Sequence, residues 1–173
     1  PSLVGSEMCI RDSIGAEGWA TRRPDTSQLA TELGLVVEPP VRQPSWVWFD
    51  DGAFAMPSDA VLGIPSDVTS ADVVTAIGGK AADLAAELDS RPVPDEVPES
   101  LGELVRTRLG EEVLTRLVGP IAGGIHAAAP DLLSADVVAP GLRAGLVRTG
   151  SLQQAVAAQV RIRGCLLYTS DAA

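Results

Sequence analysis

Residues 100–120 read SLGELVRTRLGEEVLTRLVGP, and this stretch decides the fold class of the chain. Ser100 and Glu103 have the spacing of a capping box, in which each side chain satisfies a backbone N–H at the start of a helix. Apolar side chains then recur at the spacing of one helix face, at Leu101, Leu104, Val105, Leu109, Val113, Leu114, Leu117 and Val118. We predict a helix that Gly110 kinks or divides and that Pro120 ends.

Helical patterns continue on both sides of this stretch. Apolar periodicity and capping residues predict further helices over residues 25–34, 70–77, 81–88 and 134–147 and from residue 151 onward. In the first of these, Leu29 and Leu33 form the expected buried stripe and Gly34 is the expected left-handed stop. Pro140-Gly141 is expected to interrupt the helix over 134–147.

The β structure predicted from the sequence is small. Residues 45–49 are rich in Trp, Val and Phe, Asp51-Gly52 is a tight-turn signal, and residues 53–56 return. This pattern is typical of a β-hairpin. Residues 57–65 are predicted to be a loop bracketed by prolines, and residues 121–127 a turn of small residues. The predicted fold class is therefore mostly α with a small β-hairpin.

The composition fits a globular domain and excludes several classes of function. The chain has 173 residues, 46% of them hydrophobic, which is enough for one domain with a modest core. Its net charge of −10 argues against a nucleic-acid binder, which needs a basic surface for phosphates. His126 is the single histidine, which excludes a metal site built from several histidines. No apolar run reaches the roughly 20 residues that a membrane-spanning helix needs.

The two ends of the chain differ from its middle. PSLVGSEMCIRDS (residues 1–13) and CLLYTSDAA (residues 165–173) resemble translated sequencing-adapter read-through. We therefore expect neither segment to belong to the fold, which we assign to residues 14–164. Both cysteines, Cys9 and Cys165, lie in these ends, so cysteine usage does not identify the redox compartment.

Two glycine-containing segments are candidate binding sites, and each has an ordinary structural alternative. Their residues are Gly15, Ala16, Glu17 and Gly18 in the first segment and Gly123, Gly124, Ile125 and His126 in the second. Glycine lets a backbone approach a ligand closely. The alternatives are a turn between a strand and a helix for the first segment, and a tight helix–helix connection for the second.

General catalytic motifs are missing from the sequence. It contains no G-x-G-x-x-G, no phosphate-binding loop, no H-E-x-x-H and no G-x-S-x-G. A nucleophile–base triad would need His126 as its base, and no neighbouring residue supports that role. A freestanding helical interaction module without chemistry therefore stays open as an alternative.

Several segments, in order along the chain, resemble bacterial FAD-dependent protoporphyrinogen/coproporphyrinogen oxidases of haem biosynthesis. They are the G-A-E of residues 15–17, the Trp-rich hairpin with Met-Pro at 56–57, the stretch 100–120, the G-G-I-H-A of 123–127 and the D-L-L-S of 131–134. The similarity covers essentially residues 14–164 and is densest over 101–134. The sequence departs from the family pattern at His126, Ala128 and Ala129, where Tyr, Gly and Asp are usual.

The resemblance implies an internal fragment of an α+β FAD-binding flavoprotein that lacks the N-terminal Rossmann unit. It implies that residues 14–23 contain the FAD-contacting turn, with cofactor contact at Gly15–Gly18. It implies that residues 24–164 form a mainly helical domain on the substrate and membrane side, with Gly123–His126 beside the substrate cavity. It names no catalytic residue in this chain and no metal.

The activity implied by the resemblance is oxidation of a porphyrinogen, either coproporphyrinogen III or protoporphyrinogen IX, to the porphyrin. FAD takes the electrons and O₂ reoxidises the flavin, so the cofactor carries the chemistry while the protein positions the substrate. The expected location is the cytoplasm, with peripheral membrane contact as in some members. Another amine-oxidase-like flavoprotein is a further alternative, and the fragment itself is expected to be inactive.

Deletion of residues 1–13 and 165–173 should leave the free energy of unfolding within about 1 kcal/mol of that of the whole chain, the scale of ordinary surface changes. Thermal and urea denaturation of both proteins check this. A loss of several kcal/mol, or a Cys9–Cys165 disulfide found by mass spectrometry, would show that the ends belong to the fold.

Overall fold

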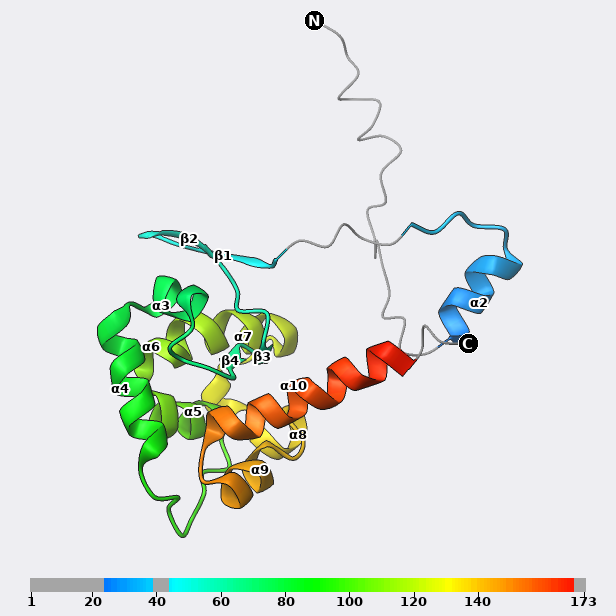
Figure 1. Cartoon of the computed structure of the whole chain (residues 1–173). Coiled ribbons are helices and arrows are strands. Elements are labelled where there is room, and N and C mark those ends of the chain that lie inside the picture. Colours follow the sequence, from blue (N-terminus) through cyan, green and yellow to red (C-terminus); the bar gives the residue numbers. More distant parts are fainter. Residues whose placement is uncertain (1–23, 39–43, 170–173) are drawn as a thin grey trace, which may run out of the picture. The chain divides into compact units, whose positions relative to one another are not determined.

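The computed structural model describes residues 24–38 and 44–169, with side chains as far as residue 162. The chain forms two compact units, divided between Arg42 and Gln43 (Figure 1). The first unit contains α2 (Asp25–Glu32). The strands of the second unit are β1 (Trp46–Phe49), β2 (Gly52–Ala55), β3 (Ala60–Val61) and β4 (Ile64–Pro65). Its helical elements are α3 (Ala71–Ile77), α4 (Gly79–Ser90), α5 (Leu101–Leu109), α6 (Glu111–Val113), η1 (Leu114–Val118), α7 (Gly119–His126), η2 (Pro130–Leu132), α8 (Ala135–Val138), α9 (Leu142–Thr149) and α10 (Leu152–Thr169).

Helix α2 ends as its sequence predicts but does not bury the predicted stripe. Gly34 has φ of +67°, the left-handed conformation expected of a helix stop. Leu29 and Leu33 are 54% and 65% exposed, whereas Ala30 is buried, so the predicted stripe is wrong within this unit. The apolar spacing still marks one helix face, but among the described residues of the unit no second element packs against it.

The predicted β-hairpin is confirmed, with its turn one residue earlier than expected. Trp46 pairs with Ala55 and Phe49 with Gly52, so Asp50 and Asp51 form the two-residue loop. Because side chains alternate along a strand, Trp46 and Trp48 lie on the exposed face of the hairpin.

The segment predicted as a proline-bracketed loop contains a second, very short hairpin, β3–β4. Leu62 and Gly63 form its turn with φ of +51° and +83°. A Cβ on Gly63 would lie 2.2 Å from the carbonyl oxygen of Leu117, so only glycine lets this turn approach the helix behind it.

The central helical stretch divides at Gly110, as predicted, but does not end at Pro120. Ser100 caps α5 by accepting a hydrogen bond from the Glu103 N–H at 3.1 Å. Beyond Gly110, α6, the π-helical η1 and α7 follow without a break, and α7 ends at Ala127. Pro120 lies in the first turn of α7, directly after the wide π turns, where a residue without an N–H is tolerated. The predicted turn over 121–127 is therefore wrong, because most of it is helical.

The C-terminal helices pack closely against each other. Pro140-Gly141 separates α8 from α9, which confirms the predicted interruption. A Cβ on Gly145 of α9 would lie 2.9 Å from the Cβ of Ala155 of α10, so the glycine sets their close approach. Helix α10 continues through Thr169, so the expected boundary at residue 165 does not coincide with a helix end.

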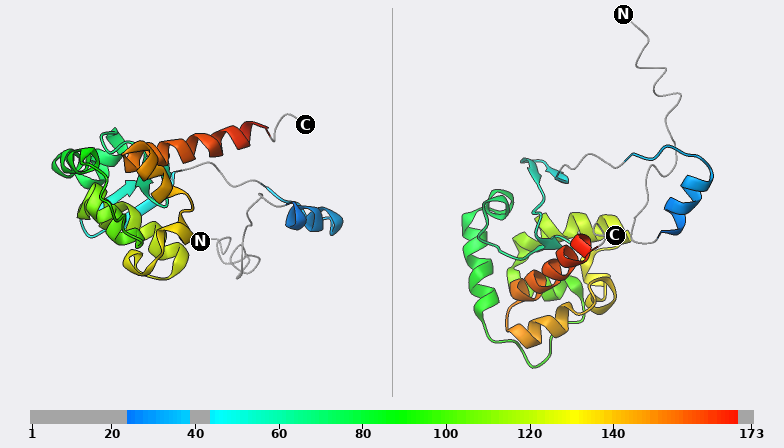
Figure 2. Two further views of the ribbon diagram at one scale, coloured as in Figure 1. Left: turned by 90° about the horizontal axis from the view of Figure 1, so that it is seen from below. Right: turned by 45° about the vertical axis from the view of Figure 1, so that its right-hand side comes forward.

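The core is built almost entirely from aliphatic side chains of the second unit. The helices of this unit gather into one body, from which the far end of α10 projects (Figures 1 and 2). Its largest fully buried members include Ile64, Leu101, Leu104, Leu109, Leu117, Leu142, Leu146 and Leu152. Phe54 is the buried aromatic residue of this cluster. Aliphatic side chains bury less area than aromatic rings, so polar contacts have a larger share in fixing this fold.

A buried carboxylate joins α4 to the start of α10. Asp89, at the end of α4, is 3% exposed. Its carboxylate accepts hydrogen bonds from the Ser151 hydroxyl at 2.5 Å, from the Leu152 N–H at 2.7 Å and from the Gln153 N–H at 3.2 Å. It therefore caps a helix more than 60 residues away in sequence and places a negative charge at the positive end of that helix.

Arg108 of α5 completes this Asp89–Arg108 network. Its side chain is 4% exposed, and it donates to backbone carbonyls rather than mainly to the carboxylate. The acceptors are the carbonyls of Asp89 at 2.5 Å, Arg91 at 2.9 Å and Gly150 at 3.0 Å. The nearest contact with the Asp89 carboxylate is 3.5 Å. Arg108 thus satisfies the carbonyls of two chain segments that leave helices α4 and α9.

Asp89→Asn should lower the free energy of unfolding by about 3 kcal/mol, because an amide NH₂ would face N–H donors and leave the buried Arg108 charge unmatched. Urea denaturation followed by circular dichroism measures this. The matched control is Glu87→Gln, which breaks an exposed ion pair with Arg91 on the same helix and should cost less than about 0.5 kcal/mol. A loss below about 1 kcal/mol for Asp89→Asn would contradict the role assigned to the network.

Candidate functional site

The predicted site residues fall in two different places. Gly15, Ala16, Glu17 and Gly18 lie outside the described residues. Gly123, Gly124, Ile125 and His126 form the last turn of α7, rather than the turn predicted for them. Ala127 then adopts the left-handed conformation, with φ of +50°, and ends the helix.

The end of α7 presents open backbone. Gly124, Ile125 and His126 are exposed. A Cβ on Gly124 would meet nothing within 4 Å, and one on Gly123 would lie 3.7 Å from the Ala128 carbonyl, an ordinary contact. Packing within the described residues therefore does not require glycine at position 124. A glycine there lowers the stability of the helix by about 1 kcal/mol relative to alanine, and packing does not account for that cost. This opposes the alternative that Gly124 serves a close helix–helix connection within this part of the chain.

The end of α7 presents two exposed side chains, those of Ile125 and His126. His126 forms no hydrogen bond or ion pair with the described residues, so no partner orients its imidazole as a base. The exposed side chain of Ile125 lies beside it. Open backbone, an apolar side chain and one imidazole are therefore exposed together at the end of this helix. The described residues contain no cluster of ligands that would hold a metal ion.

The loop after α7 is fixed by an ion pair. Arg106 of α5 donates from Nη1 and Nη2 to the two carboxylate oxygens of Asp131 in η2, at 2.9 and 3.1 Å. The hydrogen bond from Arg106 lowers the pKa of the Asp131 carboxyl below its ordinary value, and the positive charge adds to this. A Cβ on Gly102 would lie 2.4 Å from the Asp131 carboxylate, so glycine there makes room for the pair.

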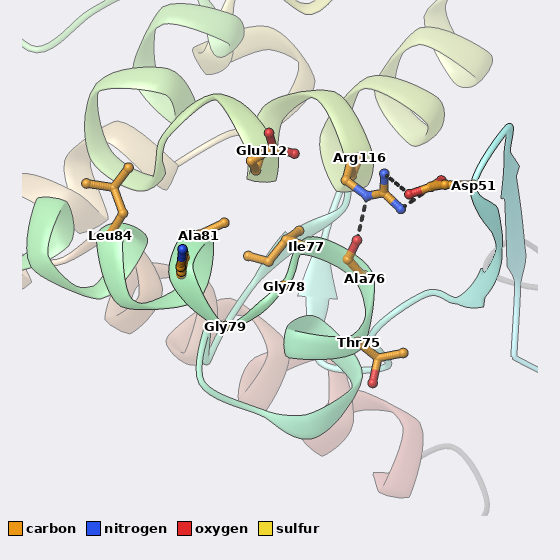
Figure 3. Close-up of a pocket in the computed structure, with 11 residues that line it drawn as sticks. Asp51, Thr75, Ala76, Ile77, Gly78, Gly79, Ala81, Leu84, Glu112 and Arg116 are labelled. Carbon is orange, nitrogen blue, oxygen red and sulfur yellow. Dashed lines mark hydrogen bonds and ion pairs between the residues drawn. The ribbon is translucent and has the colours of Figure 1, made fainter.

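An open groove of about 680 Å³ lies between the tip of the hairpin, the α3–α4 junction and η1 (Figure 3). Apolar side chains such as Ile77 and Leu84 line it together with Lys80, Glu112 and Arg116. Sequence reasoning missed this groove, because its residues come from three separate segments and form no local motif.

Arg116 is the most connected side chain of the groove (Figure 3). It donates two hydrogen bonds to the Asp51 carboxylate at 2.9 and 3.2 Å and one to the Ala76 carbonyl at 2.5 Å. The hydrogen bond from Arg116 lowers the pKa of the Asp51 carboxyl, although partial desolvation opposes the shift. Because that pKa is lowered, the pair is fully formed above the ordinary value of 3.8 and is lost only as the pH falls through the lowered value.

Every helix in the described ranges, 24–38 and 44–169, is too short or too polar to span a lipid bilayer.

Comparisons with known proteins identify similar sequences and a similar structure. The coproporphyrinogen III oxidase of Mycobacterium leprae is 32% identical over 142 residues, which cover 77% of this chain and 30% of that protein. The coproporphyrinogen III oxidase of Staphylococcus aureus is 29% identical over 145 residues, covering 80% and 31%. A crystal structure assigned as a protoporphyrinogen oxidase of Exiguobacterium sp. 255-15 superimposes with a TM-score of 0.62 at 27% identity, covering 82% of this chain and 33% of that one. No protein-family model matches the chain.

The resemblance predicted from the sequence is confirmed: the chain is similar to coproporphyrinogen and protoporphyrinogen oxidases over most of its length. The predicted fold class, mostly α with a small hairpin, is confirmed as well. The chain spans about 30% of the length of the curated relatives that it matches.

Proposed function

We propose that this chain is a segment of an FAD-dependent oxidase that converts coproporphyrinogen III or protoporphyrinogen IX to the porphyrin in haem biosynthesis, with O₂ as electron acceptor. One observation carries the proposal: about four-fifths of the chain aligns, in sequence and in structure, with about a third of proteins named as such oxidases. A freestanding interaction module would not be expected to align with these oxidases over so much of its length.

In this proposal the chain supplies substrate contacts. The end of α7, at Gly123–His126, forms a wall of the porphyrinogen site, and the open space at Gly124 supports this role. The macrocycle lies against backbone that carries no side chain, while Ile125 and His126 contact its edge. Arg106 and Asp131 hold the following loop in place. No proton transfer is assigned to His126.

The residues described here do not fit FAD. FAD bears a pyrophosphate, which needs a glycine-rich loop at a helix N-terminus. The sequence has no G-x-G-x-x-G, and its GAEG segment, residues 15–18, lies outside the described ranges. We therefore assign the FAD contact to Gly15–Gly18 together with a dinucleotide-binding unit of a longer protein, and we derive no redox step from the helical body.

The proposal includes a cytoplasmic location with peripheral membrane contact. Trp46 and Trp48 are 64% and 81% exposed on one face of the hairpin. Tryptophan rings with one apolar and one polar side are enriched where proteins meet a membrane surface. The net charge of −10 opposes binding of the chain to anionic lipid, which limits the strength of this membrane contact.

The chain alone should not retain FAD. Purification with excess FAD, followed by desalting, should leave no stoichiometric flavin absorbance in the visible range. The protein from the complete reading frame, treated in the same way, should keep about one flavin per chain. Stoichiometric flavin on the short chain would show that its own residues complete the cofactor site.

Gly124→Val in the longer protein should lower kcat/KM at least tenfold, or about 1.4 kcal/mol of transition-state stabilisation, because the side chain would push the macrocycle from α7. The melting temperature should not fall, because a Cβ there meets open space and valine is no worse than glycine in a helix. Ala144→Val, at an exposed position of α9, is the matched control; it should leave kcat/KM unchanged and lower the stability only by the helix-propensity difference, well under about 1 kcal/mol. A loss of about 1–3 kcal/mol in stability with activity per folded molecule preserved would reject the substrate-wall assignment.

A further inference from the structure

We propose that Arg116 is a positioning residue, which fixes the β1–β2 hairpin at a set angle to the helix that carries Gly123–His126. The contacts by which Arg116 joins the hairpin to the helical body are here called the Arg116 clamp. They are a property of this chain, so the proposal rests on the proposed function only where it concerns substrate. Arg116 lies in η1, which leads directly into α7.

The contacts of Arg116 with the hairpin cover both its turn and its inner face. Its guanidinium binds the Asp51 carboxylate in the turn with two hydrogen bonds. The guanidinium carbon also lies 4.8 Å from the ring centroid of Phe49 and 5.4 Å from that of Phe54, with the two rings stacked against each other. Cation–π contact therefore adds to the ion pair on the face opposite Trp46 and Trp48.

The third contact of Arg116 anchors the clamp to the helical body. Its Nε donates to the carbonyl of Ala76, in the last turn of α3. Carbonyls in a last turn lack a helical partner, so this bond also caps α3. The Arg116 side chain is 22% exposed, so water competes less for its carbonyl and ring contacts, whereas the Asp51 carboxylate that it binds is 63% exposed.

The hairpin needs such a clamp. Its strands have four residues each and pair with no third strand among the described residues, and an isolated two-stranded hairpin of this size is marginally stable in water. Of its side chains, Phe54 is buried, whereas Val47 and Phe49 are only partly covered. The hairpin lies over the end of the body where α3 is found (Figure 1), and Arg116 joins it there to the helix leading to α7.

Lysine cannot replace arginine in this geometry. The planar guanidinium offers a two-pronged face to a carboxylate, a third donor to a carbonyl and a flat surface to rings at the same time, whereas an ammonium is a single point charge. Arg116→Lys therefore keeps the charge and removes the clamp.

The test uses time-resolved tryptophan anisotropy of this chain in a Trp19→Phe background, so that Trp46 and Trp48 are the only emitters among its three tryptophans. Arg116→Lys should at least double the amplitude of anisotropy lost within a few nanoseconds, with little change in melting temperature. Asp51→Asn, which keeps the Ala76 and ring contacts, should give a smaller increase. Arg148→Lys, at an exposed position of α9, is the matched control. Unchanged anisotropy in both Arg116→Lys and Asp51→Asn would overturn the clamp.

The longer protein tests the positioning role. Arg116→Lys should raise KM for porphyrinogen at least fivefold while kcat stays within twofold, because loss of the clamp loosens the attachment of η1, which leads directly into the proposed substrate wall at Gly123–His126. A loosened hairpin with KM and kcat both unchanged would overturn the positioning role. Absence of porphyrinogen oxidation in the wild-type longer protein would instead reject the proposed function, and the anisotropy result would still decide the clamp.

Discussion

The buried carboxylate of Asp89 and the guanidinium of Arg108 are the polar contacts on which the rest of the helical body depends. Together they join the end of α4, the middle of α5 and the α9–α10 connection, three places that no strand pairing connects. An aliphatic core can slide or repack at modest cost, whereas a buried charge tolerates few arrangements because each lost hydrogen bond is expensive. The network therefore selects one packing of these helices, and the direction of α10 follows from it.

The local patterns of the sequence predicted much of the fold. Helix α5, its N-cap at Ser100, the break at Gly110 and the hairpin are all local features, and all are confirmed, although only the Ser100 half of the capping box forms. The predicted end at Pro120 is wrong because the π-helical segment before it has no recognised sequence signal. The predicted burial of Leu29 and Leu33 is wrong because spacing identifies a helix face but not what covers it.

The contacts that fix the tertiary structure were not predictable in the same way. Asp89 caps a helix whose first residue lies 63 positions later, and Arg116 binds Asp51 across 65 positions. Charged residues at such separations look like ordinary surface charges until the fold brings them together. The site residues show the same limit: the sequence singled out Gly123–His126, but their exposed helical setting and the groove beside Arg116 come from the structure.

The proposed division of labour is that this chain holds the substrate while a unit outside it holds FAD. The measurement that tests this account most directly is porphyrin fluorescence from the purified product of the complete reading frame, supplied with coproporphyrinogen III or protoporphyrinogen IX in air. Enzyme-dependent fluorescence above the autoxidation rate is expected with at least one of the two substrates, and none is expected from this chain alone. A flavin-loaded longer protein that oxidises neither substrate would contradict it.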